Sequence, residues 1–374
     1  MTRNLLQNHQ TLLLSCCKRL LKTEETTVLQ KLIRMDVNWN DLLNDARSLE
    51  ISPILWWAFK DLDLSSIPQD ITDQFRFEYK ENFARNMVLS DRLAWLCRTF
   101  EDNAIPFVPV KGLILADQTF PSEALRSLCD LDVLIRPESL SKAVQILSQN
   151  GLLLAGRDSL FDVDLDKHRD VQFVGALKGF DYVLELHWKF KDTFIKLQQD
   201  VVWNNLVDYE WNGLKLRVFS PELTLLHLIH HLHYQGFTLK ILMDVAATLK
   251  TYESSLDWDQ VLRLADNFKM KWCVYLALEC ACSLMDQPYP DGAFILKSEF
   301  HKHRKWMLKL LSAEGWYFRR LAYAIQSYSY LRALFSVFFT DGSYLTILKL
   351  LTRRALWKAS SPQSVPVVMH NVDH

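Results

Sequence analysis

The stretch CDLDVLI, from Cys129 to Ile135, decides the fold of this chain. Polar and apolar residues alternate along it, which is typical of a β-strand with one buried face. Successive side chains of a strand point to opposite faces, so Asp130 and Asp132 leave the same face. The leucine, valine and isoleucine around them point the other way, into the core. This stretch therefore predicts a strand that presents two neighbouring carboxylates.

Two carboxylates side by side repel each other unless a cation lies between them. Hard divalent ions such as Mg²⁺ take oxygen ligands and usually keep substrate phosphates in their coordination shell. A third carboxylate is available at Glu185 in YVLELHW, where Glu185 and His187 share one strand face. If the two strands are neighbours, Asp130, Asp132 and Glu185 converge on a two-metal phosphoryl-transfer site, with ions ~3.5–4 Å apart. The alternatives are a solvated strand edge for the aspartates and a surface cross-strand pair for Glu185.

Upstream of this strand, IPFVPVKG (residues 105–112) is a short β-rich run that ends in the turn Lys111-Gly112. The following LILADQTF has helical character. Backbone N–H groups at a helix start attract phosphate, and a lysine there adds positive charge. The turn is either such a phosphate-binding element or an ordinary strand-to-helix connection.

Downstream, RPESLSKAVQILSQNGL predicts a capped helix that Gly151 ends. After a polar stretch, VQFVG and FDYVLELHWKF predict a β-hairpin that turns near Lys178-Gly179. Strands and helices alternating over residues 105–220 indicate a small α/β core.

Both flanks of this core are expected to be helical. Residues 1–104 keep a helical period of apolar residues with few breakers. In the C-terminal region, 221–374, the first helix has Ser220 as N-cap and Pro221 in its first turn. Further helices are predicted over 239–251, 257–268 and 271–285. The predicted fold class is α+β, with a small core flanked by two helical regions.

The composition is that of an ordinary globular protein, with 374 residues, 49% of them hydrophobic and 23% charged. The formal net charge of −1 argues against general nucleic-acid binding. Seven cysteines, an odd number without C-x-x-C spacing, favour reduced thiols in a cytoplasmic protein. No stretch approaches the ~20 apolar residues that a transmembrane helix needs.

Several separate motifs resemble the uncharacterised nucleotidyltransferase family of the DNA-polymerase-β-like superfamily. They are the Lys-Gly turn, an arginine (Arg126) shortly before the paired aspartates, the LI-R-P helix start, the ELHW strand from Glu185 to Trp188, and a helical region from Leu225 to Ala246. The resemblance covers roughly residues 105–250. It implies a mixed sheet flanked by helices.

The resemblance also implies transfer of a nucleotidyl group from an NTP to an acceptor hydroxyl or phosphate, with Mg²⁺ or Mn²⁺. Proteins similar to this family often accompany natural-product tailoring enzymes, so a small molecule or modified peptide is the expected acceptor. Transfer of another group from a nucleotide-activated donor stays open. Asp130, Asp132 and Glu185 are the expected catalytic and metal-binding residues.

One departure from the superfamily concerns the phosphate-binding turn. In the superfamily this turn usually contains Gly-Ser or Gly-Gly and lies a short distance before the D-x-D motif in the sequence. Here Lys111-Gly112 lies further upstream and has no serine beside it. Lys111, Gly112 and Arg126 are therefore expected to bind the triphosphate, although Arg126 would equally serve in a salt bridge. His187 either touches substrate or orients Glu185. The same departure keeps open an alternative function, a catalytically inactive nucleotide-binding or partner-binding module.

Four histidines between His227 and His233 lack the glutamate of an H-E-x-x-H zinc motif, so core packing is the expected role. Asp244 is either a structural capping residue or an acceptor-side contact. Residues 302–358 are strongly basic, with only Glu314 and Asp341 as acidic residues. They are expected to pack on the core as an amphipathic layer, with an acidic partner or an anionic membrane surface as alternatives.

Overall fold

Strand β2 (Asp130–Ile135) lies inside a five-stranded sheet in the computed structural model. The strand order is β1-β2-β5-β4-β3. β2 pairs antiparallel with β1 and parallel with β5, so the sheet is mixed. The other strands are β1 (Phe107–Pro109), β3 (Leu153–Leu154), β4 (Asp170–Leu177) and β5 (Phe180–His187). This α+β architecture confirms the predicted fold class.

The structure describes residues 8–155, 168–190, 197–235 and 238–300. All of them belong to one compact unit, Met1–Tyr323, and a second unit, Ala324–His374, lies outside the described residues. The basic block at 302–358 also lies outside them.

The predicted hairpin is the pair of strands β4 and β5, joined by Lys178 and Gly179. Both linking residues have positive φ, 52° and 82°, as a tight two-residue hairpin turn requires. A turn of this kind fixes the register of the pair, which places Asp170 opposite His187 and Gln172 opposite Glu185.

A second, two-stranded sheet was not predicted from the sequence. It consists of β6 (Leu206–Trp211) and β7 (Leu214–Phe219), which pair antiparallel. The turn between them is Asn212-Gly213, with φ of 49° and 75°. Asn-Gly is a strong short-range hairpin signal, so this element was readable from the sequence.

The helix α5 (Gln69–Asp102) links the N-terminal helices to the sheet. Its buried side chains Leu89, Leu93, Leu96 and Phe100 recur at helical spacing and join the core that covers one face of the sheet. Leu131 and Val133 of β2 belong to the same core. The other N-terminal helices are α1 (Asn8–Leu20), α2 (Thr26–Leu32), α3 (Trp39–Ser48) and α4 (Ser52–Phe59), as predicted for this region.

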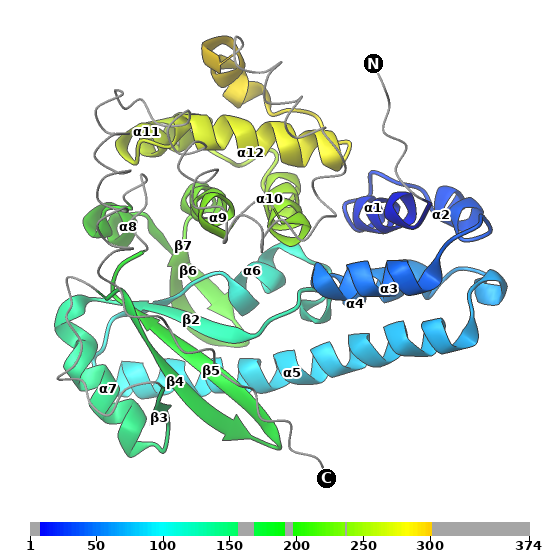
Figure 1. The fold of residues 1–374 in the computed structure, drawn as a ribbon. Coiled ribbons are helices and arrows are strands. Elements are labelled where there is room, and N and C mark those ends of the chain that lie inside the picture. The colour runs from blue at the N-terminus through cyan, green and yellow to red at the C-terminus, as the bar shows by residue number, and fades with distance from the viewer. Residues whose placement is uncertain (1–7, 156–167, 191–196, 236–237, 301–374) are drawn as a thin grey trace, which may run out of the picture. The chain divides into compact units, whose positions relative to one another are not determined.

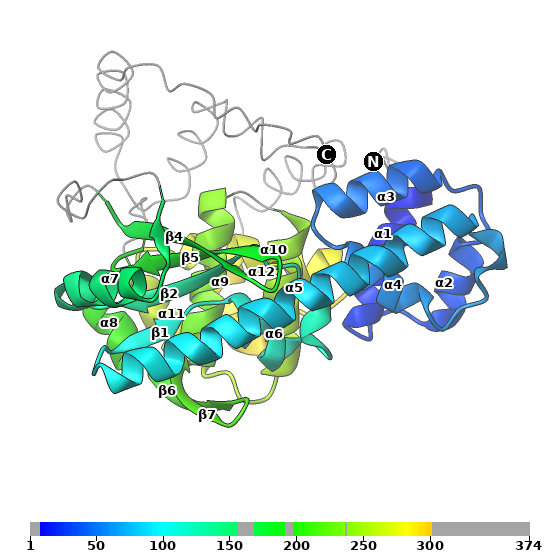
Figure 2. The same cartoon turned by 90° about the horizontal axis from the view of Figure 1, so that it is seen from below.

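The opposite face of the sheet lies under α6 (Gly112–Thr119), α9 (Pro221–Gln235) and α10 (Leu239–Thr251) (Figure 1). Figure 2, seen from below, has α5 in front of the sheet and these helices behind it. The remaining helices are α7 (Leu140–Gln149), α8 (Gln199–Asn204), α11 (Trp258–Asn267) and α12 (Lys271–Leu284). Strand β2 therefore has an apolar face toward α5 and a carboxylate face toward the C-terminal helices.

Helix α9 begins as its sequence predicts, because the Ser220 hydroxyl accepts a hydrogen bond from the Leu223 amide. Helices α10, α11 and α12 follow at the predicted places. Among the described helices, none combines the length and apolar character needed to cross a membrane.

Candidate active site

The pairing of β2 with β5 assembles the carboxylates of the site. In this parallel register Asp132 is the direct partner of Glu185, and Leu134 is the partner of His187. Paired residues of neighbouring strands project from the same face, and so do residues two apart on one strand. Asp130, Asp132, Glu185 and His187 thus share the face that lies under α9 and α10.

His187 lies between the two paired carboxylates. Its Nε2 is 2.8 Å from Asp132 Oδ1 and 3.3 Å from Glu185 Oε2. Its Nδ1 lies 3.6 Å from Asp170 Oδ2 on the neighbouring strand β4. The ring is therefore held between carboxylates on both of its nitrogen sides.

One group of described residues has the composition and spacing of a metal site. Asp132, Glu185 and His187 each offer a ligand atom, and these atoms all lie within 4.8 Å of one another. Asp130 is not a member of this group, so the proposed three-carboxylate cluster differs in one residue from the group that the structure brings together. The donor set of two carboxylates and an imidazole fits a divalent cation.

The charges of the site act on one another strongly. Burial, together with the charges of Asp132 and Glu185, raises the pKa of Asp130 to about 6. Burial also disfavours charge on Asp132, but Lys111 and the hydrogen bond from His187 outweigh it and hold the pKa of Asp132 well below its usual range. Burial alone would lower the pKa of His187, yet Asp132 and Glu185 raise it to about 9. The ionised form of Asp132 is thus stabilised by neighbouring positive charges, whereas the ionised form of Asp130 is disfavoured by burial and by neighbouring carboxylates.

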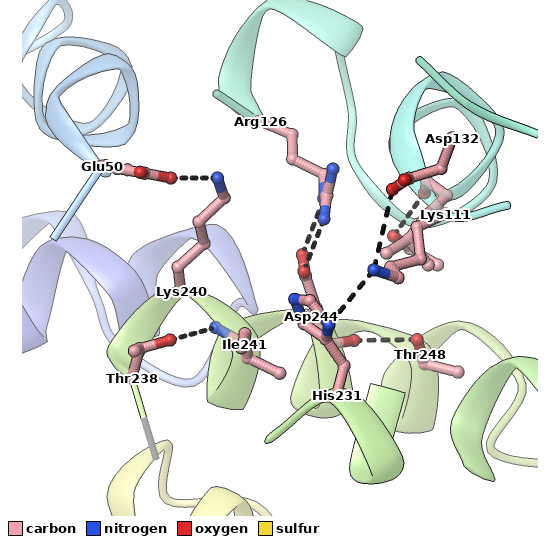
Figure 3. A network of polar contacts seen from close by, with 12 residues as sticks. Glu50, Lys111, Arg126, Asp132, His231, Thr238, Lys240, Ile241, Asp244 and Thr248 are labelled. Atoms are coloured by element: carbon pink, nitrogen blue, oxygen red, sulfur yellow. Dashed lines mark hydrogen bonds and ion pairs between the residues drawn. The ribbon is translucent and has the colours of Figure 1, made fainter. Parts of the chain in front are cut away.

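Lys111 brings a positive charge to this face from the start of α6. It precedes the first turn of α6, where it has an unusual backbone conformation with φ 54° and ψ −125°, followed by Gly112 with φ 51°. Its Nζ lies 3.7 Å from Asp132 Oδ2 and 3.2 Å from His231 Nδ1 (Figure 3). Positive φ at a residue with a bulky side chain is strained, and such strain concentrates at functional sites.

His231 reaches Lys111 from α9. Burial, and then the charge of Lys111, lower the pKa of His231 well below its ordinary value. The neutral ring accepts a hydrogen bond from the lysine ammonium at Nδ1. His231 therefore holds Lys111 beside Asp132, a role that the sequence did not reveal.

Arg126 has a protein partner in the structure. Its Nε and Nη2 donate to the two carboxylate oxygens of Asp244 at 3.0 and 2.9 Å, which is a bidentate ion pair (Figure 3). Both residues are buried, with exposures of 8% and 1%. Asn86 of α5 donates to the Arg126 carbonyl at 2.9 Å. Asp244 thus contacts an arginine of the core, and triphosphate binding by Arg126 stays a prediction.

Further groups around the site were missed by reasoning from the sequence. Gln172 donates to Glu185 Oε1 at 2.7 Å, and Asp170 faces His187 as described above. The hairpin turn at Lys178-Gly179 predicts both pairs, because it fixes which residues of β4 and β5 lie opposite each other. Lys240 of α10, paired with Glu50, partly offsets the rise in the pKa of Asp130, and no signal in the sequence brings these residues together.

His227 and His230 lie buried on α9, and His227 packs against the rings of Phe190 and Phe219. This arrangement agrees with the core-packing role expected of them.

The five-stranded mixed sheet with flanking helices agrees with the nucleotidyltransferase-type fold expected from the motifs. A model for uncharacterised nucleotidyltransferases matches residues 35–286. The chain belongs to this family, which confirms the resemblance inferred from its motifs and its assignment as a transferase.

No curated protein matches the chain. Among solved structures, it is similar to the lincomycin-bound lincosamide antibiotic adenylyltransferase LnuA, at 15% identity over 42% of this chain and 94% of that one, with a TM-score of 0.30. The antibiotic-resistance factor ANT(2'')-Ia has 14% identity over 53% and 97% of the two chains, with a TM-score of 0.34. An antigenic nucleotidyltransferase-like protein from Paracoccidioides brasiliensis has 14% identity over 57% and 96%, with a TM-score of 0.33. The identities of 14–15% and the TM-scores of 0.30–0.34 mark these structures as distant from this chain.

Proposed function

We propose that this protein uses a divalent metal ion, Mg²⁺ or Mn²⁺, to transfer a nucleotidyl group from an NTP to an acceptor hydroxyl or phosphate. The observation that carries the proposal is the register that makes Asp132 the direct neighbour of Glu185, with Asp130 on the same face. Carboxylates held this closely favour binding of cations that bridge them to phosphate oxygens.

Asp130, Asp132 and Glu185 would hold the metal ions, which would supply positive charge for the triphosphate. When bound, the metal neutralises the charge that develops on the phosphate oxygens and orients the triphosphate. Lys111 supplies a positive charge beside Asp132 at the start of α6. In the proposed complex this charge and the adjacent backbone amides bind the phosphates. Arg126 is proposed to add to the positive potential at the site from its buried place.

In the proposed reaction the acceptor oxygen forms a bond to the α-phosphorus of the NTP. The bond between that phosphorus and the bridging oxygen breaks, and pyrophosphate leaves with its electron pair. The acceptor proton passes to Glu185, the proposed base of the site. A small molecule or modified peptide is the proposed acceptor, bound against the helical flanks.

A second candidate function is a nucleotide-binding module without catalytic activity. The observation that favours it is the Lys111-Gly112 turn, which lacks the serine of the superfamily. Both candidates bind NTP with metal, but only the enzyme releases pyrophosphate when an acceptor is present.

The experiment is incubation of the protein with α-labelled NTP, Mg²⁺ or Mn²⁺ and cell extract, with pyrophosphate release and labelled products measured by mass spectrometry. The wild type should form a labelled product, and Asp132→Asn should form none. Asp208→Asn is the matched control, because the side chain of Asp208 on β6 is 95% exposed. Nucleotide binding without any product over a broad set of acceptors would favour the second candidate.

A further inference from the structure

We propose that His187 is itself a metal ligand, and that the site consequently prefers Mn²⁺ to Mg²⁺. The inference rests on the proposed function, since it concerns the metal of the same site. It changes the role of His187, which the sequence indicates only as a substrate contact or a support for Glu185.

The geometry of the three donor atoms carries this inference. In octahedral coordination with metal–ligand distances of about 2.1 Å, neighbouring ligand atoms are about 3 Å apart. Asp132 Oδ1 and Glu185 Oε2 lie 2.8 and 3.3 Å from His187 Nε2. The imidazole nitrogen thus has the spacing of a neighbouring ligand to both carboxylates.

A carboxylate also lies near the other nitrogen of the ring, just beyond hydrogen-bonding distance. A histidine that binds a metal through one nitrogen usually donates its second N–H to a carboxylate, which fixes the orientation of the ring. His187 Nδ1 lies 3.6 Å from Asp170 Oδ2, and Arg169 Nε holds the same oxygen at 2.8 Å. Because β4 pairs with β5 so that Asp170 faces His187, the hairpin itself builds this support.

A donor set with an imidazole changes which cation binds best. Mg²⁺ favours oxygen ligands and water, whereas affinity for nitrogen donors rises from Mn²⁺ along the first transition row. Two carboxylates with one imidazole therefore suit Mn²⁺, which accepts both kinds of ligand.

The test is electron paramagnetic resonance of the full-length protein titrated with Mn²⁺, without nucleotide. The signal of free Mn²⁺ gives the dissociation constant of the Mn²⁺ complex. Competition with Mg²⁺ gives the ratio of the two affinities. Modulation of the electron spin echo by ¹⁴N shows that a nitrogen atom binds the metal. We expect ¹⁴N modulation that changes in protein labelled with ¹⁵N-histidine, and Mn²⁺ bound at least tenfold more tightly than Mg²⁺. This labelling experiment needs no variant and stands even where a substitution prevents folding.

His187→Gln should lose the nitrogen signal and weaken Mn²⁺ binding at least tenfold. Asp170→Asn should keep the signal and weaken binding less. His9→Gln is the matched control, because His9 Nε2 also faces a carboxylate, Asp45 Oδ2 at 3.3 Å, but on the N-terminal helices. This control should bind Mn²⁺ as the wild type does.

Mn²⁺ bound without nitrogen modulation, or with equal affinity in His187→Gln, would overturn the inference. In that case pyrophosphate release with Mg²⁺ would still support the proposed function. Nitrogen modulation in a protein that releases no pyrophosphate would support the inference and contradict the enzyme.

Discussion

At the scale of single residues, Asp130 and Asp132 have opposite electrostatic situations although they are two positions apart on one strand. Lys111 and His187 compensate Asp132, whereas burial and the neighbouring carboxylates act against ionised Asp130. The sequence predicts that both side chains share a face, because this follows from the strand period alone. It does not predict which of them is compensated, because the compensating groups come from β5 and α6.

The raised pKa of Asp130 predicts a pH-dependent cost in the metal-free protein. A carboxyl whose pKa is higher in the folded state stabilises the fold at low pH, and this contribution is lost as pH rises through about 6. In buffer that contains a chelator, at a pH above 6, the free energy of unfolding of Asp130→Asn should therefore exceed that of the wild type by roughly 2–3 kcal/mol. The advantage should vanish near pH 4. Urea denaturation at the two pH values measures it, and an advantage that is equal at both would contradict the account.

Lys111 is predicted to bind the triphosphate. Lys111→Ala should raise the apparent KM for NTP by roughly 10- to 100-fold, since a charge-assisted contact contributes about 1.5–3 kcal/mol. Metal binding without nucleotide should change little by comparison. Lys250→Ala is the control, because Lys250 forms an exposed ion pair with Glu253. If nucleotide affinity is the same in Lys111→Ala and Lys250→Ala, Lys111 has no part in the site.

At the scale of elements, α9 and α10 complete the site from the C-terminal side. His231 of α9 contacts Lys111, and Asp244 of α10 contacts Arg126, each across more than a hundred residues of sequence. The helices themselves follow from capping and apolar spacing, so the sequence predicts them within a residue or two. Their contacts with the core do not follow, because local patterns carry no information about packing between distant segments. The hairpin β6–β7 differs from these long-range contacts, because its Asn212-Gly213 turn is a local signal from which the sequence can predict it.

The buried pair of Arg126 and Asp244 is predicted to stabilise the junction between the core and α10. Asp244→Ala leaves a buried guanidinium without its partner, so it should lower the free energy of unfolding by about 3–5 kcal/mol. Replacing both residues by leucine should cost much less than the sum of the single changes Arg126→Leu and Asp244→Leu. Glu253→Ala at the exposed Lys250 pair should cost less than about 1 kcal/mol. Chemical denaturation of these variants checks this, and additive effects of Arg126→Leu and Asp244→Leu would contradict it.

At the scale of the whole molecule, the chain combines a small mixed sheet with helical regions on both sides in sequence. Helix α5 belongs to the N-terminal region by position, yet its C-terminal half packs into the core of the sheet. The division of the chain into three domains, 1–104, 105–220 and 221–374, therefore stays a prediction. The resemblance to the family comes from motifs spread over roughly residues 105–250, and the family model extends beyond them, over residues 35–286.

The measurement that tests the central claim most directly is calorimetric titration of NTP into the protein, with Mg²⁺ and with chelator. The account predicts that the wild type binds NTP much more tightly with Mg²⁺, and that Asp130→Asn and Asp132→Asn each lose most of this difference. The double variant should be scarcely worse than either single one, because ligands of one metal centre act as a unit. Equal Mg²⁺-dependent NTP binding in the wild type and in the double variant would contradict the account.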